Sequence, residues 1–185
     1  MRKRVLIAAL LLMPSLAFAA GAPAAGLGEE DKLFAQLKQA DSTETAKPIE
    51  DKLGQLFRVS GSASVDLLMT RAGVALGQAD HATARTLIES VTHLAPRYAE
   101  AWRMRARMLQ ASGDDAGAMI SLQKAVAINP RHFPAMAELG EMLEDYGDKP
   151  GALKLYRRVL GLDPQMHLAA ERAKALEKAV EGQGI

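Results

Sequence analysis

The sequence contains no cysteine among its 185 residues. Disulfide bonds, thiol chemistry and lipid attachment through an N-terminal cysteine are therefore excluded. Aromatic residues make up only 4% of the chain, and no long stretch alternates apolar with polar residues, so the sequence predicts no β-strand. It also lacks a glycine-rich phosphate loop, a nucleophile elbow and histidines at metal-ligand spacing. The fold must therefore be stabilised by helix packing alone.

The first 19 residues have the pattern of a secretory signal peptide. Three basic residues at positions 2–4 precede an apolar run from Val5 to Met13, and Ala17 and Ala19 form a small-residue cleavage site. This apolar run is too short to cross a bilayer, which requires roughly 20 residues. We therefore expect cleavage after Ala19, export to the bacterial periplasm with full secretion left open, and no stable membrane insertion afterwards. An uncleaved N-terminal anchor is the alternative.

Cleavage would change the charge of the chain. It would remove three of 23 basic residues and leave all 22 acidic ones, so the net charge would become −2 instead of +1. A nucleic-acid-binding protein needs a basic footprint, so we expect no nucleic-acid partner. The remaining length suits one domain. Its first residues, 20–28 (AGAPAAGLG), are small and rich in helix breakers, which predicts a disordered leader.

From Val65 onward the chain repeats every 34 residues, in the frames 65–98, 99–132 and 133–166. The same kinds of residue recur at fixed positions of each frame. Large apolar residues occupy the fourth position, small residues the eighth and twentieth, aspartate the sixteenth, and proline the thirty-second. These columns are Leu68, Trp102 and Met136; Ala72, Ala106 and Gly140; Ala84, Ala118 and Ala152; Asp80, Asp114 and Asp148; and Pro96, Pro130 and Pro164.

The columns describe two helices of about 14 residues in each frame. The small residues are expected where the two helices cross, since a larger side chain there would overpack by roughly 1–3 kcal/mol. The aspartates fall near the start of the second helix, where a carboxylate accepts hydrogen bonds from free backbone N–H groups. Each proline ends the second helix, because the residue before it is pushed out of helical geometry.

This pattern resembles the tetratricopeptide repeat, a 34-residue helix–turn–helix unit. The match is strongest over residues 101–130, AWRMRARMLQASGDDAGAMISLQKAVAINP. Two departures from the family pattern stand out: Arg71 and Arg105 occupy a position where leucine is usual, and Ala79 replaces the turn glycines Gly113 and Gly147. The resemblance implies an all-α, right-handed solenoid of helical hairpins.

A stack of hairpins needs its two ends covered. Residues 167–181 predict a C-terminal capping helix, with Leu168, Leu176 and Val180 on its apolar side. Residues 29–62 predict an N-terminal helix pair, which could be a degenerate repeat and is expected to cover the first repeat.

In stacked repeats the first helices line a concave groove, and we expect its exposed positions to bind a partner. The predicted groove residues are Met69, Leu76, Arg103, Arg107, Gln110, Glu138, Glu141, Glu144 and Asp145. Two interpretations compete. Arg103 and Arg107 could simply pair with Glu138 and Glu141, which as exposed pairs would contribute about 0–1 kcal/mol each. Alternatively, the strip recognises a peptide.

We therefore predict a non-catalytic adaptor or scaffold that binds a protein or peptide, with no cofactor and no metal. A periplasmic holdase that retains unfolded clients is the alternative within the same class. A metal-handling protein or a hydrolase is the alternative from another class. The four histidines (His81, His93, His132 and His167) are scattered and are predicted to lie at turns and helix ends, exposed to solvent.

Overall fold

The computed structural model describes residues 27–181, so the predicted signal peptide and most of the predicted leader lie outside the described part. Within this range no helix is both long enough and apolar enough to span a bilayer. The first helix begins at Leu27, two residues before the predicted start of the N-terminal helix pair at residue 29. The helices are α1 (Leu27–Gln39), α2 (Thr43–Phe57), α3 (Ala63–Gly77), α4 (His81–Leu94), α5 (Ala99–Ala111), α6 (Asp115–Ile128), α7 (Phe133–Asp145), α8 (Lys149–Leu162) and α9 (His167–Glu181).

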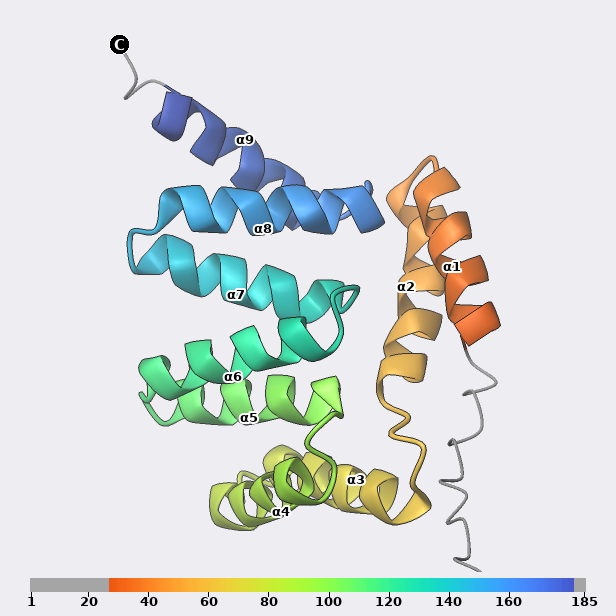
Figure 1. The fold of residues 1–185 in the computed structure, drawn as a ribbon, viewed down its shortest axis with the longest axis vertical. Helices are drawn as coiled ribbons and strands as arrows, with labels where there is room; N and C mark the ends of the chain where they lie inside the picture. The colour runs from red at the N-terminus through yellow and green to blue at the C-terminus, as the bar shows by residue number, and fades with distance from the viewer. Residues whose placement is uncertain (1–26, 182–185) are drawn as a thin grey trace, which may run out of the picture.

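The repeated part of the chain is a solenoid of three helical hairpins, as the sequence predicts. Helices α3 and α4, α5 and α6, and α7 and α8 form the hairpins, and each lies beside the next (Figure 1). Helix α4 packs on α5 and α6 packs on α7, so the second helix of one hairpin covers the first helix of the next. A single apolar core runs through most of this stack.

The two helices of each hairpin meet at small residues. Ala84, Ala118 and Ala152 have no exposed surface. In the third hairpin the opposing residue is Gly140, and a Cβ atom added there would lie 3.0 Å from the Tyr156 ring. The first two hairpins have alanine at the position of Gly140 and a smaller Ile88 or Leu122 at the position of Tyr156. Glycine in place of alanine at position 140 therefore makes room for the larger ring of Tyr156.

The aspartate column caps the second helices, as predicted. The side chains of Asp80, Asp114 and Asp148 accept hydrogen bonds from the backbone N–H groups of Thr83, Gly117 and Gly151, at 3.0, 2.9 and 2.9 Å. Each bond satisfies a backbone donor that the first turn of a helix leaves free and places negative charge at the positive end of the helix dipole. These caps fix where α4, α6 and α8 begin.

The C-terminal helix α9 packs along α8 and buries Ala169, Ala173 and Leu176. Arg157 donates to Glu177 across this contact, with Nη2 and Oε1 2.9 Å apart. The prediction that Leu168 belongs to the packed side is wrong, since 43% of its surface is exposed. Ala169 takes that place, because the helix lies close enough to α8 that a small residue fits against it.

The N-terminal helix pair does not cover the first repeat, contrary to expectation. Helices α1 and α2 form a hairpin that runs across the stacked helices, beside the loops that join one repeat to the next (Figure 1). Phe34 and Phe57 pack against Phe133 at the start of α7, with ring centroids 6.3 and 5.9 Å apart. The aromatic side chains of this hairpin therefore find their apolar partners at a repeat junction and not on α3.

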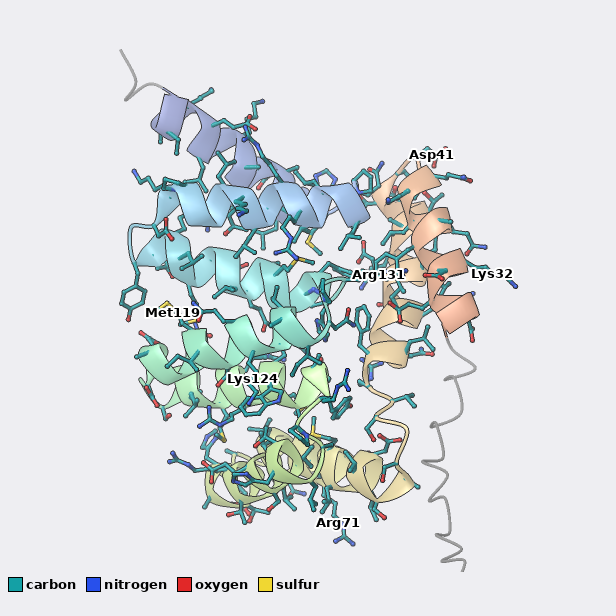
Figure 2. The ribbon with its side chains drawn as sticks, in the orientation of Figure 1. Lys32, Asp41, Arg71, Met119, Lys124 and Arg131 are labelled. Carbon is teal, nitrogen blue, oxygen red and sulfur yellow. The ribbon has the colours of Figure 1, made fainter. Side chains whose placement is uncertain are left out.

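Polar contacts attach the same hairpin to three successive junctions. Tyr98 donates to the carbonyl of Arg58 at 2.7 Å, and Gln165 donates to the carbonyl of Ala40 at 2.9 Å. Between them, Arg131 forms ion pairs with Glu30 and Asp31 and lies over the Phe34 ring (Figure 2). These junction residues occupy the last two positions of each frame, where no single residue type recurs in all three frames. The periodicity therefore carried no signal for this contact.

The turn inside the first hairpin is strained. Gly113 and Gly147 adopt φ of 81° and 84°, whereas Ala79, at the matching position, is forced to 57°. A Cβ atom disfavours this left-handed region, by roughly 1–2 kcal/mol per residue.

Replacing Ala79→Gly should stabilise the protein. Relief of the strain outweighs the added freedom of the unfolded chain, so we expect the free energy of unfolding to rise by about 0.5–1 kcal/mol. Urea unfolding followed by circular dichroism measures this change. The matched control is Ala175→Gly, an exposed residue in the middle of α9, which should lower stability instead. Equal losses in both variants would contradict the assignment of strain to Ala79.

Candidate functional site

The nine predicted groove residues lie on the first helices of the three hairpins, α3, α5 and α7. We call the surface formed by these positions the inner face. The structure divides the predicted set in two. Met69 and Leu76 of α3, Arg103 of α5 and Glu138 and Glu144 of α7 are packed or paired, whereas Arg107, Gln110 and Asp145 are exposed.

The contribution of α3 is largely buried. Met69 exposes 7% of its surface and packs in a small cluster with Val65, Val91 and Tyr98. Leu76 is half-buried against the main core. Met69 and Leu76, which were predicted to face a partner in the groove, therefore belong to the packing of the fold and do not form an open apolar surface.

Arg103 lies at the centre of a polar network between α5 and α7. Its Nε and Nη2 donate to the two carboxylate oxygens of Glu100 at 2.8 and 2.7 Å, and its Nη1 donates to Glu138 Oε1 at 2.7 Å. The guanidinium of Arg103 and the carboxylate of Glu100 are thus joined by two parallel hydrogen bonds, a bidentate arrangement. Arg103 therefore joins two repeats, and its guanidinium is engaged on both sides.

His132 completes this network and is buried, contrary to the expectation of a solvent-exposed histidine. It is 1% exposed, caps the start of α7 and stacks on Phe57 with ring centroids 4.5 Å apart. Its Nδ1 accepts from the Ala135 backbone N–H, which leaves Nε2–H to donate to Glu100 at 3.0 Å. The hydrogen bonds thus define the tautomer.

Sequence reasoning missed the pairing of Glu100 with His132. The two residues are 32 positions apart, at opposite ends of one frame. The last residue of one frame lies beside the next hairpin, as the first residues of the frame do. A spacing of about one full repeat was therefore the only sign in the sequence that Glu100 and His132 could meet. Scattered histidines gave no reason to test it.

Burial and hydrogen bonding act in opposite directions on the two carboxylates of the network. Burial would raise the pKa of Glu100, but hydrogen bonds from Arg103 and His132 outweigh it and hold the pKa at about 2. The pKa of Glu138 is raised, because burial outweighs its single bond from Arg103. Its Oε2 is buried without a hydrogen-bond partner among residues 27–181. Glu100 is therefore the carboxylate that holds the network together.

The far half of the inner face remains accessible. Arg107, Gln110 and Asp145 are exposed, and Glu141 is half-buried. Of the two predicted ion pairs, Arg103 with Glu138 is present, whereas Arg107 has no carboxylate within ion-pair distance in the described part of the chain. This half therefore presents a cation without an ion pair in that part of the chain, and its charge acts on Glu138 of α7.

The acidic end of the inner face is unevenly compensated. Glu144 accepts from Tyr156 at 3.3 Å and from Arg172 of α9 at 3.4 Å. Burial raises the pKa of Glu141, and the neighbouring charges of Glu138, Asp145 and Glu144 raise it further, against the opposing effect of Arg172. A cationic group placed here would relieve repulsion between carboxylates.

A pocket of about 670 Å³ lies outside the inner face, between the end of α2 and two repeat junctions. Val59, Pro96, Arg97 and Asn129 contribute to its walls. Residues 27–181 contain no group of three His, Asp or Glu side chains arranged to hold a metal ion.

Comparison with known proteins gives relatives for the repeats. No protein-family model matches the sequence. A TPR repeat-containing protein of Rhizobium etli is 33% identical over 78 residues, which cover 42% of this chain and 38% of the relative. The chain therefore spans less than half the length of that curated relative.

Solved structures share the fold. The first TPR of Spaghetti (RPAP3), bound to an HSP90 peptide, has a TM-score of 0.58 at 20% identity and covers 63% of this chain and 93% of that one. The Yersinia enterocolitica type III secretion chaperone SycD, in complex with a peptide of the translocator YopD, has a TM-score of 0.56 at 14% identity, over 67% and 97%. The Sgt2 TPR domain from Aspergillus fumigatus has a TM-score of 0.57 at 19% identity, over 66% and 82%.

Column pattern, hairpin geometry and these likenesses define the class as a solenoid of helix–turn–helix repeats. The chain therefore has the fold of tetratricopeptide-repeat domains, and its three hairpins correspond to the frames 65–98, 99–132 and 133–166 read from the sequence.

Glu100→Gln should destabilise the protein at neutral pH. The pKa of Glu100 is lowered from its ordinary value of 4.5 to about 2, so the charged form contributes stability that is present above pH 4.5 and lost as the pH falls through 2. We expect a loss of roughly 3 kcal/mol at pH 7 that shrinks over this acidic window. Chemical unfolding of both proteins between pH 2 and 7 measures it.

The control for this variant is Glu89→Gln. It removes a carboxylate that also pairs with an arginine of its own helix, Arg85, but in an exposed position. It should change stability by less than about 1 kcal/mol. Similar losses for Glu100 and Glu89, or a Glu100→Gln effect independent of pH, would refute the assignment.

Proposed function

We propose that this chain is a non-catalytic interaction module that binds a segment of another protein along the exposed half of the inner face. The observation that supports the proposal is the exposed Arg107 on α5, which forms no ion pair within residues 27–181, on the same inner face as the acidic side chains Glu141 and Asp145 of α7. Exposed charges of both signs on rigid helices select a partner by complementary charge. A segment with a carboxylate facing Arg107 and a basic side chain facing Glu141 fits this arrangement.

Bound peptides in two structural neighbours support the same class of ligand. The Spaghetti repeat domain holds an HSP90 peptide, and SycD holds a peptide of YopD. Both likenesses lie at or below 20% identity, so they support a peptide as the ligand class without indicating its sequence.

A structural role for His132 favours binding over catalysis. A histidine beside a carboxylate is the usual arrangement of a general base. Here both ring nitrogens are engaged, by the Ala135 N–H and by Glu100, and the ring is 1% exposed. The pair therefore cannot reach a substrate without unfolding the start of α7.

We further propose that the module acts in the bacterial periplasm as an adaptor. The N-terminal pattern of basic residues, apolar run and Ala17–Ala19 site supports export. Intact-mass measurement of the protein recovered from its host tests this: a chain that starts at Ala20 supports export, and a chain that starts at Met1 in the cytoplasmic fraction rules it out.

Arg107→Glu should weaken partner binding far more than it changes the stability of the protein. A photo-crosslinking residue at Gln110 first captures the partner in the host, and binding of the captured segment to purified protein is then measured by fluorescence anisotropy. Reversal of an exposed charge that faces a carboxylate should weaken binding at least about tenfold. The melting temperature should fall by only a few degrees, because Arg107 forms no ion pair with the buried network and its charge acts on Glu138 only at longer range.

The matched control is Lys154→Glu, the same charge change at an exposed position of α8. It should bind within about twofold of the original protein, since rim charges far from a contact contribute little. Equal capture from positions 110 and 154, or unchanged binding by Arg107→Glu, would reject the inner face as the site. Capture of many unrelated unfolded proteins would instead favour the holdase alternative.

A further inference from the structure

The first hairpin ends the stack with an exposed apolar surface. Leu67 and Val74 lie two turns apart on α3 and expose 53% and 55% of their surfaces. Arg71 lies between them on the same side of the helix and points away from the other repeats (Figure 2). We call this surface, formed by Leu67, Arg71 and Val74 of α3 together with the adjoining side of α4, the end face.

The same positions are buried in the next two repeats. The counterparts of Leu67 are Ala101 and Ala135, neither of which is exposed, and the counterparts of Val74 are Met108 and Met142, which expose 6% and 3%. They are covered because α4 packs on α5 and α6 packs on α7. The end face is therefore a stacking surface that meets no preceding repeat in the described part of the chain.

The seventh position follows the same trend. Arg71 is exposed, whereas Arg105 is half-buried and donates to Ser121 at 2.7 Å, and Leu139 is 5% exposed. The α1–α2 hairpin, which the sequence predicted to cover the first repeat, runs along the repeat junctions instead (Figure 1). The position of that hairpin leaves the end face open.

The end face has both a projection and a hollow. A hollow of about 410 Å³ lies between α3 and α4 and is lined by Thr70, Val74 and Leu87, among others. Leu67 stands outside this hollow, one turn before Thr70. The rim carries one cation, Arg71, and one anion, Asp80. A surface with an apolar projection beside a hollow that Val74, Ala75 and Leu87 line in part, and with one charge of each sign, is complementary to a copy of itself turned by a two-fold rotation.

We propose that the end face is the contact surface of a two-fold dimer of this chain. Each Leu67 enters the hollow of the other copy, and each Arg71 faces Asp80 of the other copy. A head-to-tail arrangement is blocked, because the opposite end of the stack is covered by α9, whose outer side carries Glu171, Lys174 and Lys178. Association through the end face therefore closes at two copies.

Single cysteines provide the direct test, because the chain has none of its own. Leu67→Cys and Val74→Cys are made in the full chain, and its N-terminus is established by intact mass. A short bismaleimide should link both variants into covalent dimers at micromolar concentration. Ile120→Cys is the matched control, since Ile120 is an equally exposed apolar residue on α6, and it should remain monomeric.

Sedimentation equilibrium of Leu67→Asp/Val74→Asp provides an independent measurement. The original protein should sediment at twice the chain mass, and the double variant should dissociate at least about tenfold more readily, because carboxylates would be buried without partners. Ile120→Asp should behave as the original. Both altered residues are exposed in one copy, so thermal melting of the double variant should match that of the control.

Three results would overturn the dimer. The first is that the unaltered protein is monomeric at hundreds of micromolar. This result would overturn the dimer even if another protein were found to bind the end face. The second is a dimer that persists in the double variant, and the third is crosslinking from Ile120→Cys as strong as from Leu67→Cys. Peptide binding at Arg107 is measured separately, so a monomeric protein would leave the proposed function intact.

Discussion

The close approach of two helices within each hairpin is the constraint on which the other surfaces depend. Ala84, Ala118 and Ala152 are fully buried at the crossings, and Gly140 makes room for Tyr156 in the third hairpin. Two helices that touch through small residues can pack in only one register, because a shift along either axis would place a large side chain at the crossing. That register fixes which side of each first helix faces the preceding repeat and which belongs to the inner face.

The α1–α2 hairpin adds a second constraint, across the repeats. It contacts the junction before α5 through Tyr98, the junction before α7 through Arg131 and His132, and the junction before α9 through Gln165. Repeat proteins are otherwise held only by contacts between neighbours. Because the α1–α2 hairpin contacts three junctions, it limits bending of the stack. The spacing of the inner-face helices is therefore fixed before any ligand binds.

The polar network at Glu100 divides the inner face by function. Arg103, Glu138 and His132 use their charges and hydrogen bonds to join repeats. Breaking a buried network of this kind leaves charges without partners, so these residues are poorly suited to exchange with a ligand. Arg107 and Asp145 take no part in this network, and they are the exposed charges that we propose for recognition.

The sequence by itself determined the repeat length, the small residues at the helix crossings, the aspartate caps and the all-α class, because these features rest on contacts between nearby residues that recur in every frame. Only the tertiary structure decided that Glu100 pairs with His132, that the N-terminal hairpin lies along the junctions, and that Leu67 and Val74 stay exposed. These features depend on contacts that occur only once in the molecule. The residues that make such contacts are separated in the sequence by about one repeat, as for Glu100 and His132, or by most of the chain, as for Ala40 and Gln165. A periodic pattern can predict only the contacts that recur in every repeat. The packing of a segment that occurs once depends on the shape and charge of its own side chains, which the repeat pattern does not predict.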